Sequence, residues 1–463
     1  MNNLNKKYSL LLVAFTLAFT SCQVARTYQL PEVNTRALYR DAASGDTTTI
    51  ADLPWKDLFK DQQLQKLIDE GLTHNINLQI AYTRIRSAES YFKQSRAALL
   101  PGVNANAGIN LNKLSDAQGG GFINNTRVYQ LGLSSSWEAD LWGKLSSTSR
   151  ANLATVLQNK AYSRAVQTGL ISSIANYYYS LLALDQQLTI TEQTVKNWIQ
   201  SVETMRALKE AAVVTGAAVV QSEANRYAVE VTIPDLKQRI RETENALSII
   251  LGRAPGAIER SDLNSQIVPE VLNTGVPAQL LSRRPDVQQA EYNYRYYFEN
   301  INVAKSYFYP ALTISASGGL SNTSLSNFFT AGSIFGNLAG GLTQPIFNKR
   351  INKTRLEVAL AAQDEALLSF KNSLLSAGQE VSDAMSAYQS AQEKNETRTK
   401  QLASLQKSIE YTQELLKYGS ANYTEVINAQ QSYLGAQLNR VNDRLQQLQA
   451  VVELYRALGG GLK

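Results

Sequence analysis

The feature that most constrains this chain is a stretch in which apolar and polar residues alternate one by one. From Val103 to Asn112 every odd position is apolar and every even position is Asn or Gly. Such a period of two is typical of a β-strand. After a polar loop over 115–127 the alternation resumes, so we predict a β-hairpin over residues 101–142. The second strand has an apolar face made of Tyr129, Leu131, Leu133 and Trp137.

The polar face of this hairpin is suited to a water-filled lumen. It consists of Asn, Ser, Gly and Gln with almost no charge. A strand of about ten residues, at ~3.3 Å per residue and a tilt near ~40°, spans roughly 25 Å, which fits the apolar band of a membrane barrel. Trp137 and Trp142 fall near one strand end, where an aromatic belt would lie. Considered alone, the stretch is also compatible with a soluble hairpin.

The alternating stretch occurs a second time. Residues 309–318 repeat it, a loop rich in Gly, Ser and Asn covers 321–333, and a fourth strand is predicted from Gly336 to Phe347. The second hairpin is therefore expected over 310–347, and the spacing of about 205 residues indicates an internal duplication. Four strands cannot close a barrel, and an open strand edge is not stable in lipid, so several chains must contribute. Three copies would supply twelve strands.

The N-terminus has the pattern of an export signal. Lys6 and Lys7 precede an apolar run over 10–19, and Thr20-Ser21 lead to the single cysteine, Cys22. This order predicts a signal peptide over 1–21. A cysteine that follows small residues is typical of bacterial lipoproteins, in which it is acylated, although an ordinary signal peptide with a stray cysteine is the alternative. We expect a lipid-anchored tether over 22–63 and, with one cysteine, no intramolecular disulfide.

Long helices with a heptad pattern follow both hairpins. They are predicted over 144–213 and 350–417, and the first would be roughly 100 Å long. Apolar residues at alternate steps of three and four make helices coil around one another. Return helices are predicted over 217–251 and 420–458. The heptad residues of the first long helix are Leu170, Ile174, Tyr177, Leu181, Leu184, Leu188, Val195, Trp198, Val202 and Met205.

These elements define two repeats and a membrane α+β fold. Each long helix is expected to turn at a glycine in the left-handed conformation, Gly216 in the first repeat and Gly419 in the second. We expect a trimeric 12-stranded transmembrane β-barrel, with four strands per chain, continued by a long α-helical coiled-coil periplasmic barrel. The predicted divisions are a first repeat at 64–252, an equatorial insertion at 253–276, a second repeat at 277–458 and a tail at 459–463.

Several motifs resemble TolC-type outer-membrane efflux proteins. They include WKDLF at 55–59 and LYRALGGG at 454–461, and the most specific is LLSRRPDVQQAE at 280–291. The last is similar to the lipoprotein branch of the family, the nodulation-T type outer-membrane factors of resistance-nodulation-division systems. We interpret it as a structural helix start, with Pro285 in the first turn. The resemblance implies a homotrimeric, passive exit duct in the outer membrane that receives substrates from a periplasmic adaptor protein and an inner-membrane pump.

The resemblance also implies where the aperture of the duct lies. TolC-type channels carry two acidic residues just after the second tip turn, and the matching positions here are Glu425 and Asn428; Asn428 departs from the acidic pattern. A ring of glutamates would repel itself and favour protonation or a bound cation. The alternative is that Glu425 is a solvated surface charge. In the first repeat the matching residues are Ser222 and Glu223, and the tip turns expected to contact the adaptor contain Gly216, Ala217, Gly419 and Ser420.

Few residues offer catalytic or metal chemistry. His74 is the only histidine and has no cysteine or second histidine beside it to form a metal site. Nucleophile motifs and phosphate-binding glycine loops are absent from the sequence, and its net charge of +6 is not gathered into a nucleic-acid motif. We expect no enzyme activity and no cofactor. A trimeric structural or adhesive protein with a coiled-coil stalk is the alternative, and drugs, bile salts, dyes and metal ions all stay open as substrates.

Overall fold

The chain forms two compact units, each assembled from three separate segments. The first unit comprises residues 1–32, 84–160 and 289–370, and the second comprises 33–83, 161–288 and 371–463. Residues 1–21, Cys22 and Gly419 lie outside the described part of the chain. The computed structural model describes residues 24–33, 38–40, 48–113, 125–268, 274–418, 420 and 422–462.

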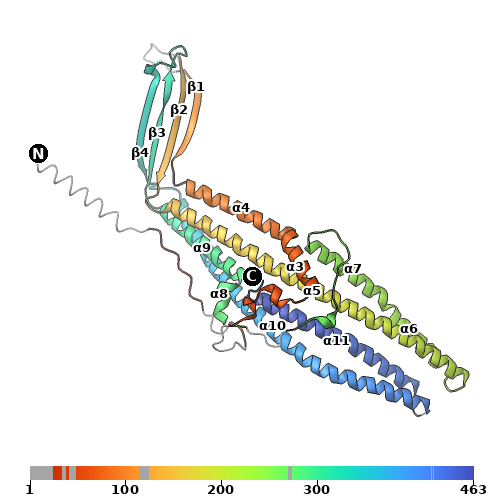
Figure 1. The fold of residues 1–463 in the computed structure, drawn as a ribbon. Coiled ribbons are helices and arrows are strands. Elements are labelled where there is room, and N and C mark those ends of the chain that lie inside the picture. Colours follow the sequence, from red (N-terminus) through yellow and green to blue (C-terminus); the bar gives the residue numbers. More distant parts are fainter. Residues whose placement is uncertain are drawn as a thin grey trace. The chain divides into compact units, whose positions relative to one another are not determined.

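The first unit contains a four-stranded antiparallel sheet whose strands lie in chain order (Figure 1). β1 pairs with β2 and β3 pairs with β4, which confirms both predicted hairpins, and β2 pairs with β3 to join them. We predicted that the fourth strand ends at Phe347, but it ends at Thr343, because Pro345 has no amide hydrogen to donate to the ladder. The strands are β1 Gly102–Lys113, β2 Asn125–Ala139, β3 Ala311–Asn322 and β4 Ile334–Thr343.

The strand register gathers apolar side chains on one face of the sheet. Leu131 lies opposite Ala107 and Leu320, and Leu320 lies opposite Ile334, so one apolar row crosses all four strands. Directly opposed residues of antiparallel neighbours lie on the same face. Ile334 is 69% exposed and Leu338 is 76% exposed, so within one chain this apolar face is uncovered.

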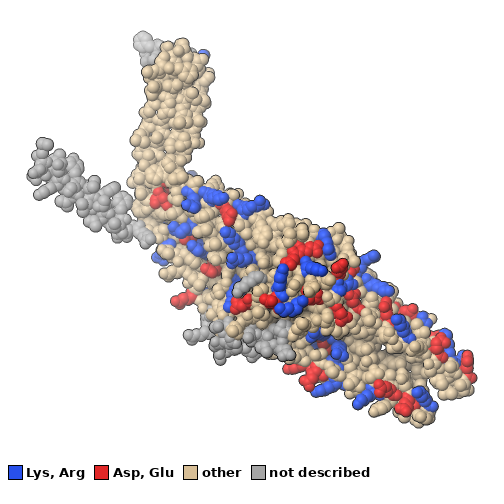
Figure 2. Space-filling model, viewed as in Figure 1, with Lys and Arg blue, Asp and Glu red and all other residues tan. Residues whose placement is uncertain are grey.

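The other face of the sheet is polar and almost uncharged. The Asn106 amide donates to the Ser134 hydroxyl over 2.8 Å. Charged residues occur only at strand ends, as Lys113, Arg127 and Glu138. Figure 2 shows the visible surface of the sheet nearly free of charged side chains, which gather instead over the helices. The composition expected for a lumen face is therefore present on one side of a folded sheet.

The helices include two of 67 residues each, α5 and α10. In α5, Ile174 and Leu181 are fully buried as the heptad pattern predicts, whereas Tyr177 is 36% exposed. None of the helices in the described segments is long and apolar enough to cross a membrane. The helices are η1 Ile50–Asp52, α2 Trp55–Leu58, α3 Gln62–His74, α4 Ile76–Ala97, α5 Lys144–Glu210, α6 Gly216–Glu230, α7 Thr232–Ile250, η2 Leu263–Ser265, η3 Pro277–Gln279, α8 Leu280–Arg283, α9 Pro285–Ser306, η4 Ala331–Ser333, α10 Ile351–Lys417 and α11 Tyr423–Ala457.

The first return helix is divided, whereas we predicted one helix over 217–251. α6 ends at Glu230 and α7 begins at Thr232. Pro234 lies in the first turn of α7, where its missing amide hydrogen prevents the bond that a continuous helix would make to the carbonyl of Glu230. The proline is therefore the physical reason for the break.

The turn after α5 does not use a left-handed glycine, contrary to our prediction. Gly216 lies in α6, and the residue with positive φ is Ala212, at 57°. The Val213 amide donates to the Leu208 carbonyl over 2.9 Å, and the Ala212 amide donates to the Lys209 carbonyl over 3.0 Å. These two bonds form a Schellman motif, a common end for a helix, with alanine at the position that glycine usually occupies.

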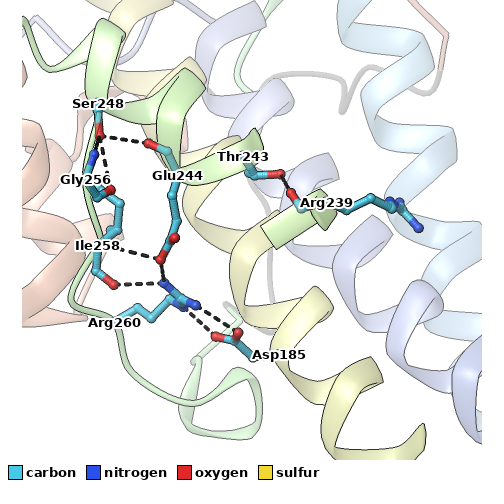
Figure 3. A network of polar contacts seen from close by, with 8 residues as sticks. All are labelled: Asp185, Arg239, Thr243, Glu244, Ser248, Gly256, Ile258 and Arg260. Carbon is cyan, nitrogen blue, oxygen red and sulfur yellow. Dashed lines mark hydrogen bonds and ion pairs between the residues drawn. The ribbon is translucent and has the colours of Figure 1, made fainter. Parts of the chain in front are cut away.

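An arginine in the segment after α7 ties that segment to two helices of the second unit (Figure 3). The Arg260 guanidinium donates to both carboxylate oxygens of Asp185 in α5, over 2.5 and 2.9 Å, and to Glu244 in α7 over 2.5 Å. It also donates to the Ile258 carbonyl over 2.9 Å. This irregular segment, part of the predicted insertion at 253–276, is thus held by charge-assisted hydrogen bonds.

Candidate functional site

The candidate site lies in the second unit, where the turns of the two helical hairpins pack together. The α5–α6 hairpin and the α10–α11 hairpin share one apolar cluster at these ends, which we call the tip cluster. Burial of apolar side chains is the main favourable contribution to such packing. The buried members of the tip cluster are Trp198, Met205, Val219, Tyr423, Val426 and Ile427.

Ser222, the residue of the first repeat that matches Glu425, is buried inside the chain. It is 0% exposed. Its Oγ donates to the Ala218 carbonyl over 3.0 Å and lies 2.5 Å from the Tyr423 hydroxyl oxygen, with which it forms a hydrogen bond. Burial raises the pKa of Tyr423. The Ser222–Tyr423 bond therefore joins α6 to α11 within one chain.

Glu223 is engaged in an ion pair between two helices. The Arg206 guanidinium in α5 donates to Glu223 in α6 over 2.6 Å and to Glu203 over 3.1 Å. Two residues further along α6, Asn225 accepts a hydrogen bond of 3.1 Å from Gln431 of α11. The first repeat thus presents its polar tip residues to neighbouring helices of the same chain.

Glu425 and Asn428, in contrast, are both exposed on α11. The helix begins at Tyr423, after the Asn422 side chain accepts from the Thr424 amide over 3.2 Å. Glu425 lies in the first turn, where the helix dipole favours a negative charge. Its carboxylate forms no ion pair with the residues that the structure describes.

The two residues begin an exposed stripe that the sequence reasoning missed. Its members alternate at steps of three and four, the spacing that keeps one face of a supercoiled helix in register. The signal was present in the sequence as a heptad of small polar residues beside the apolar heptad. We call these residues the α11 stripe: Glu425, Asn428, Ser432, Gly435 and Asn439.

The other residues singled out in the sequence form no catalytic or metal-binding arrangement in the described part of the chain. Gly216 and Ala217 are exposed at the start of α6, and Ser420 is exposed before α11. His74 is the last residue of α3, and its Nδ1 lies 3.2 Å from the Glu70 carbonyl oxygen. In the parts of the chain that are described, no three His, Cys, Asp or Glu side chains come together as a metal site.

A sheet with one apolar and one polar face, combined with long helical hairpins that expose a polar stripe, is typical of a channel-forming outer-membrane subunit. The chain belongs to the outer membrane efflux protein family, whose model matches residues 67–253 and 276–460. This confirms the resemblance recognised in the sequence motifs. The protein is an outer-membrane channel component of an efflux system and extends into the periplasm, rather than an adhesive stalk.

Individual relatives are similar to this chain over nearly its whole length. The chain is 30% identical to the probable outer membrane lipoprotein SilC of Salmonella typhimurium, over 98% of this chain and 99% of the relative. It is 28% identical to the cation efflux system protein CusC of Escherichia coli K12, over 96% and 97% of the two chains. A crystal structure of a membrane protein from Pseudomonas aeruginosa has a TM-score of 0.87 at 26% identity, covering 95% of this chain and 100% of that one.

Proposed function

We propose that three copies of this chain assemble into one exit duct, in which twelve strands close a transmembrane barrel and the helices form a periplasmic tunnel. The two open edges of the sheet support this proposal. β1 and β4 are these two edges, so each has one side without a strand partner among the described residues. Lipid cannot satisfy those backbone groups, but β4 of one copy can pair with β1 of the next.

The duct works passively, with partners that supply energy and substrate. We propose that a periplasmic adaptor protein engages the tips around Ala217 and Ser420, and that an inner-membrane pump of the resistance-nodulation-division type delivers the substrate. CusC is named for cation efflux, and cations are one substrate class for this chain. We propose that the α11 stripe lines the tunnel. Beyond Glu425 the stripe has no carboxylate, which supports selection of the substrate by the pump rather than by the duct.

The assembly is tested on full-length protein extracted in detergent. Light scattering should give three times the protomer mass, and the preparation should conduct ions in planar bilayers.

We also propose that Cys22 is acylated. Protein from cells fed an alkyne fatty acid should therefore carry label that Cys22→Ala removes, while the barrel keeps the variant in the membrane. A conducting monomer or dimer would contradict the trimer, and label retained by Cys22→Ala would contradict the lipid site.

The aperture is tested by changing charge at the start of the α11 stripe. Three-fold symmetry would bring three copies of Glu425 together, where they attract cations and repel anions. Glu425→Gln should raise the Mg²⁺ concentration that blocks the channel by about tenfold, since each lost charge contact is worth ~1 kcal/mol or more. Asn428→Ala, which removes no charge, is the matched control and should change the block much less. Unaltered conductance, selectivity and block in Glu425→Gln would make Glu425 a plain surface charge.

A further inference from the structure

The segment that follows the acylation motif is held against α9 in the first unit. The Tyr28 ring packs on Tyr294 and Phe298, with centroid distances of 6.1 and 5.6 Å. Asn302 accepts from the Arg26 amide over 3.1 Å and donates to the Arg26 carbonyl over 2.9 Å. Residues 24–28 are therefore fixed in place by an aromatic contact and a pair of backbone hydrogen bonds.

This segment forms one wall of a cleft of about 870 Å³. The opposite wall is made by residues 140–143, which directly follow β2, so the cleft lies at the end of the sheet. Trp142 lines it, stacks on Tyr309 at 4.9 Å and donates to the Pro310 carbonyl over 2.7 Å. Aromatic residues with a polar handle are typical of the membrane–water interface.

The acidic residues of this cleft are already engaged. Glu299 accepts from Arg150 over 2.9 Å. The two carboxylate oxygens of Asp140 accept from the Leu145 and Ser146 amides, both over 2.8 Å. The Glu299 charge is therefore paired with Arg150 and Asp140 caps the first turn of α5, while two other cations line the cleft.

Those cations are Arg26 and Arg295. Neither forms an ion pair with the described residues, although the Arg295 charge acts on Glu291, which accepts a hydrogen bond from the Tyr28 hydroxyl. The Arg295 guanidinium lies over the Tyr28 ring at 5.2 Å, and its buried Nε has no hydrogen-bond partner in the described part of the chain. Lys305 stands close to Arg26: burial, and then the Arg26 charge, lower the pKa of Lys305. Bringing unpaired like charges together costs free energy unless an anion joins them.

We propose that the cleft binds the phosphate of an anionic phospholipid headgroup through Arg26 and Arg295. Guanidinium groups pair with phosphate oxygens in a forked geometry, and basic pockets at the membrane surface select anionic lipids. A neighbouring hollow of about 180 Å³, which shares Asp140, Leu141 and Trp142 with the cleft and is also lined by Tyr307 and Pro345, offers mainly apolar surface for the start of an acyl chain. That hollow favours a lipid over free phosphate. The inference rests on the proposed membrane placement of the sheet.

The test uses full-length trimer in detergent, titrated with palmitoyl-oleoyl phosphatidylglycerol or the zwitterionic phosphatidylcholine, with bound lipid counted by native mass spectrometry. Wild-type protein should bind the anionic lipid at least about tenfold more tightly, as expected for charge-assisted hydrogen bonds. The double variant Arg26→Gln, Arg295→Gln should lose this preference, whereas Arg295→Lys should keep much of it. Lys353→Gln, which removes an exposed charge from α10 in the same unit and lies outside the cleft lining, is the matched control.

The outcomes separate this inference from the proposed duct. A double variant that still forms conducting trimers but binds both lipids equally would support the headgroup site. A double variant that retains the full preference would overturn it. Displacement of phosphatidylglycerol by millimolar inorganic phosphate, with equal affinity for the two anions, would also overturn it, because the site would then recognise a free anion. Loss of trimers in wild-type protein would instead contradict the duct itself.

Discussion

Gly319→Ala should reduce the amount of assembled trimer in the outer membrane at least about tenfold, because a Cβ at this position of β3 would collide with the backbone of β2. A Cβ on Gly319 would lie 2.2 Å from the Leu131 carbonyl oxygen and 2.4 Å from the Gly132 Cα, both of them backbone atoms. Gly132 is the residue directly opposite Gly319 in the register. Forced overpacking typically costs ~1–3 kcal/mol, and here neither neighbour is a side chain that can rotate away.

The adjacent residue provides the matched control. In Gly318→Ala the added Cβ would meet the Phe335 carbonyl oxygen at 3.5 Å, an ordinary van der Waals contact. The two variants add the same methyl group to neighbouring positions of β3, on opposite faces of the sheet. Immunoblotting of unheated outer-membrane fractions measures the trimer. Equal trimer levels in the two variants would show that the Gly132–Gly319 contact does not limit the packing of the sheet.

Arg284→Met should lower the free energy of unfolding by about 2 kcal/mol, since the arginine is buried but its carboxylate partners are partly exposed to solvent. Arg284 is 3% exposed. Its guanidinium donates to both carboxylate oxygens of Asp286, to Glu380 over 2.7 Å and to the Ala457 carbonyl over 3.0 Å. It thereby joins the start of α9 to α10 and to the end of α11. Methionine fills a similar volume but satisfies none of these acceptors.

Urea unfolding of the detergent-solubilised protein, followed by circular dichroism, measures the difference. Lys400→Met is the control, because it removes the same charge from an ion pair with Glu396 that is 75% exposed on both sides and contributes little to stability. If Arg284→Met unfolded at the same urea concentration as the control variant, the structural role of the arginine would be contradicted.

The ion pair between Arg284 and Asp286 predicts that the stability of the protein depends on pH. Burial raises the pKa of Asp286, but the hydrogen bonds and charge of Arg284 more than offset this and hold it below its usual value of 3.8. A lowered pKa contributes stability that is present above the unfolded-state value and is lost as the pH falls through the folded-state value. The stability difference between wild type and Arg284→Met should therefore shrink below about pH 4.

Local patterns in the sequence determined the repeated elements. The period of two specifies the strands, the heptads specify the long helices, and Pro285 marks the start of α9, because each signal depends on residues only a few positions apart. Local patterns gave wrong predictions for the ends of elements, which depend on single residues. Ala212 rather than Gly216 takes the left-handed turn, and Pro345 ends β4 before Phe347.

Only the tertiary structure decided which polar groups are free. Ser222 and Glu425 follow the two tip turns at similar distances, yet Ser222 is bonded to Tyr423 across 201 residues, whereas Glu425 stays exposed. The unpaired arginines at the end of the sheet likewise depend on a docked N-terminal segment 276 residues from its partner Asn302. The sequence states which residues are present and how they repeat along one element. Whether a charge is paired depends on contacts between distant segments, and those exist only in the folded chain.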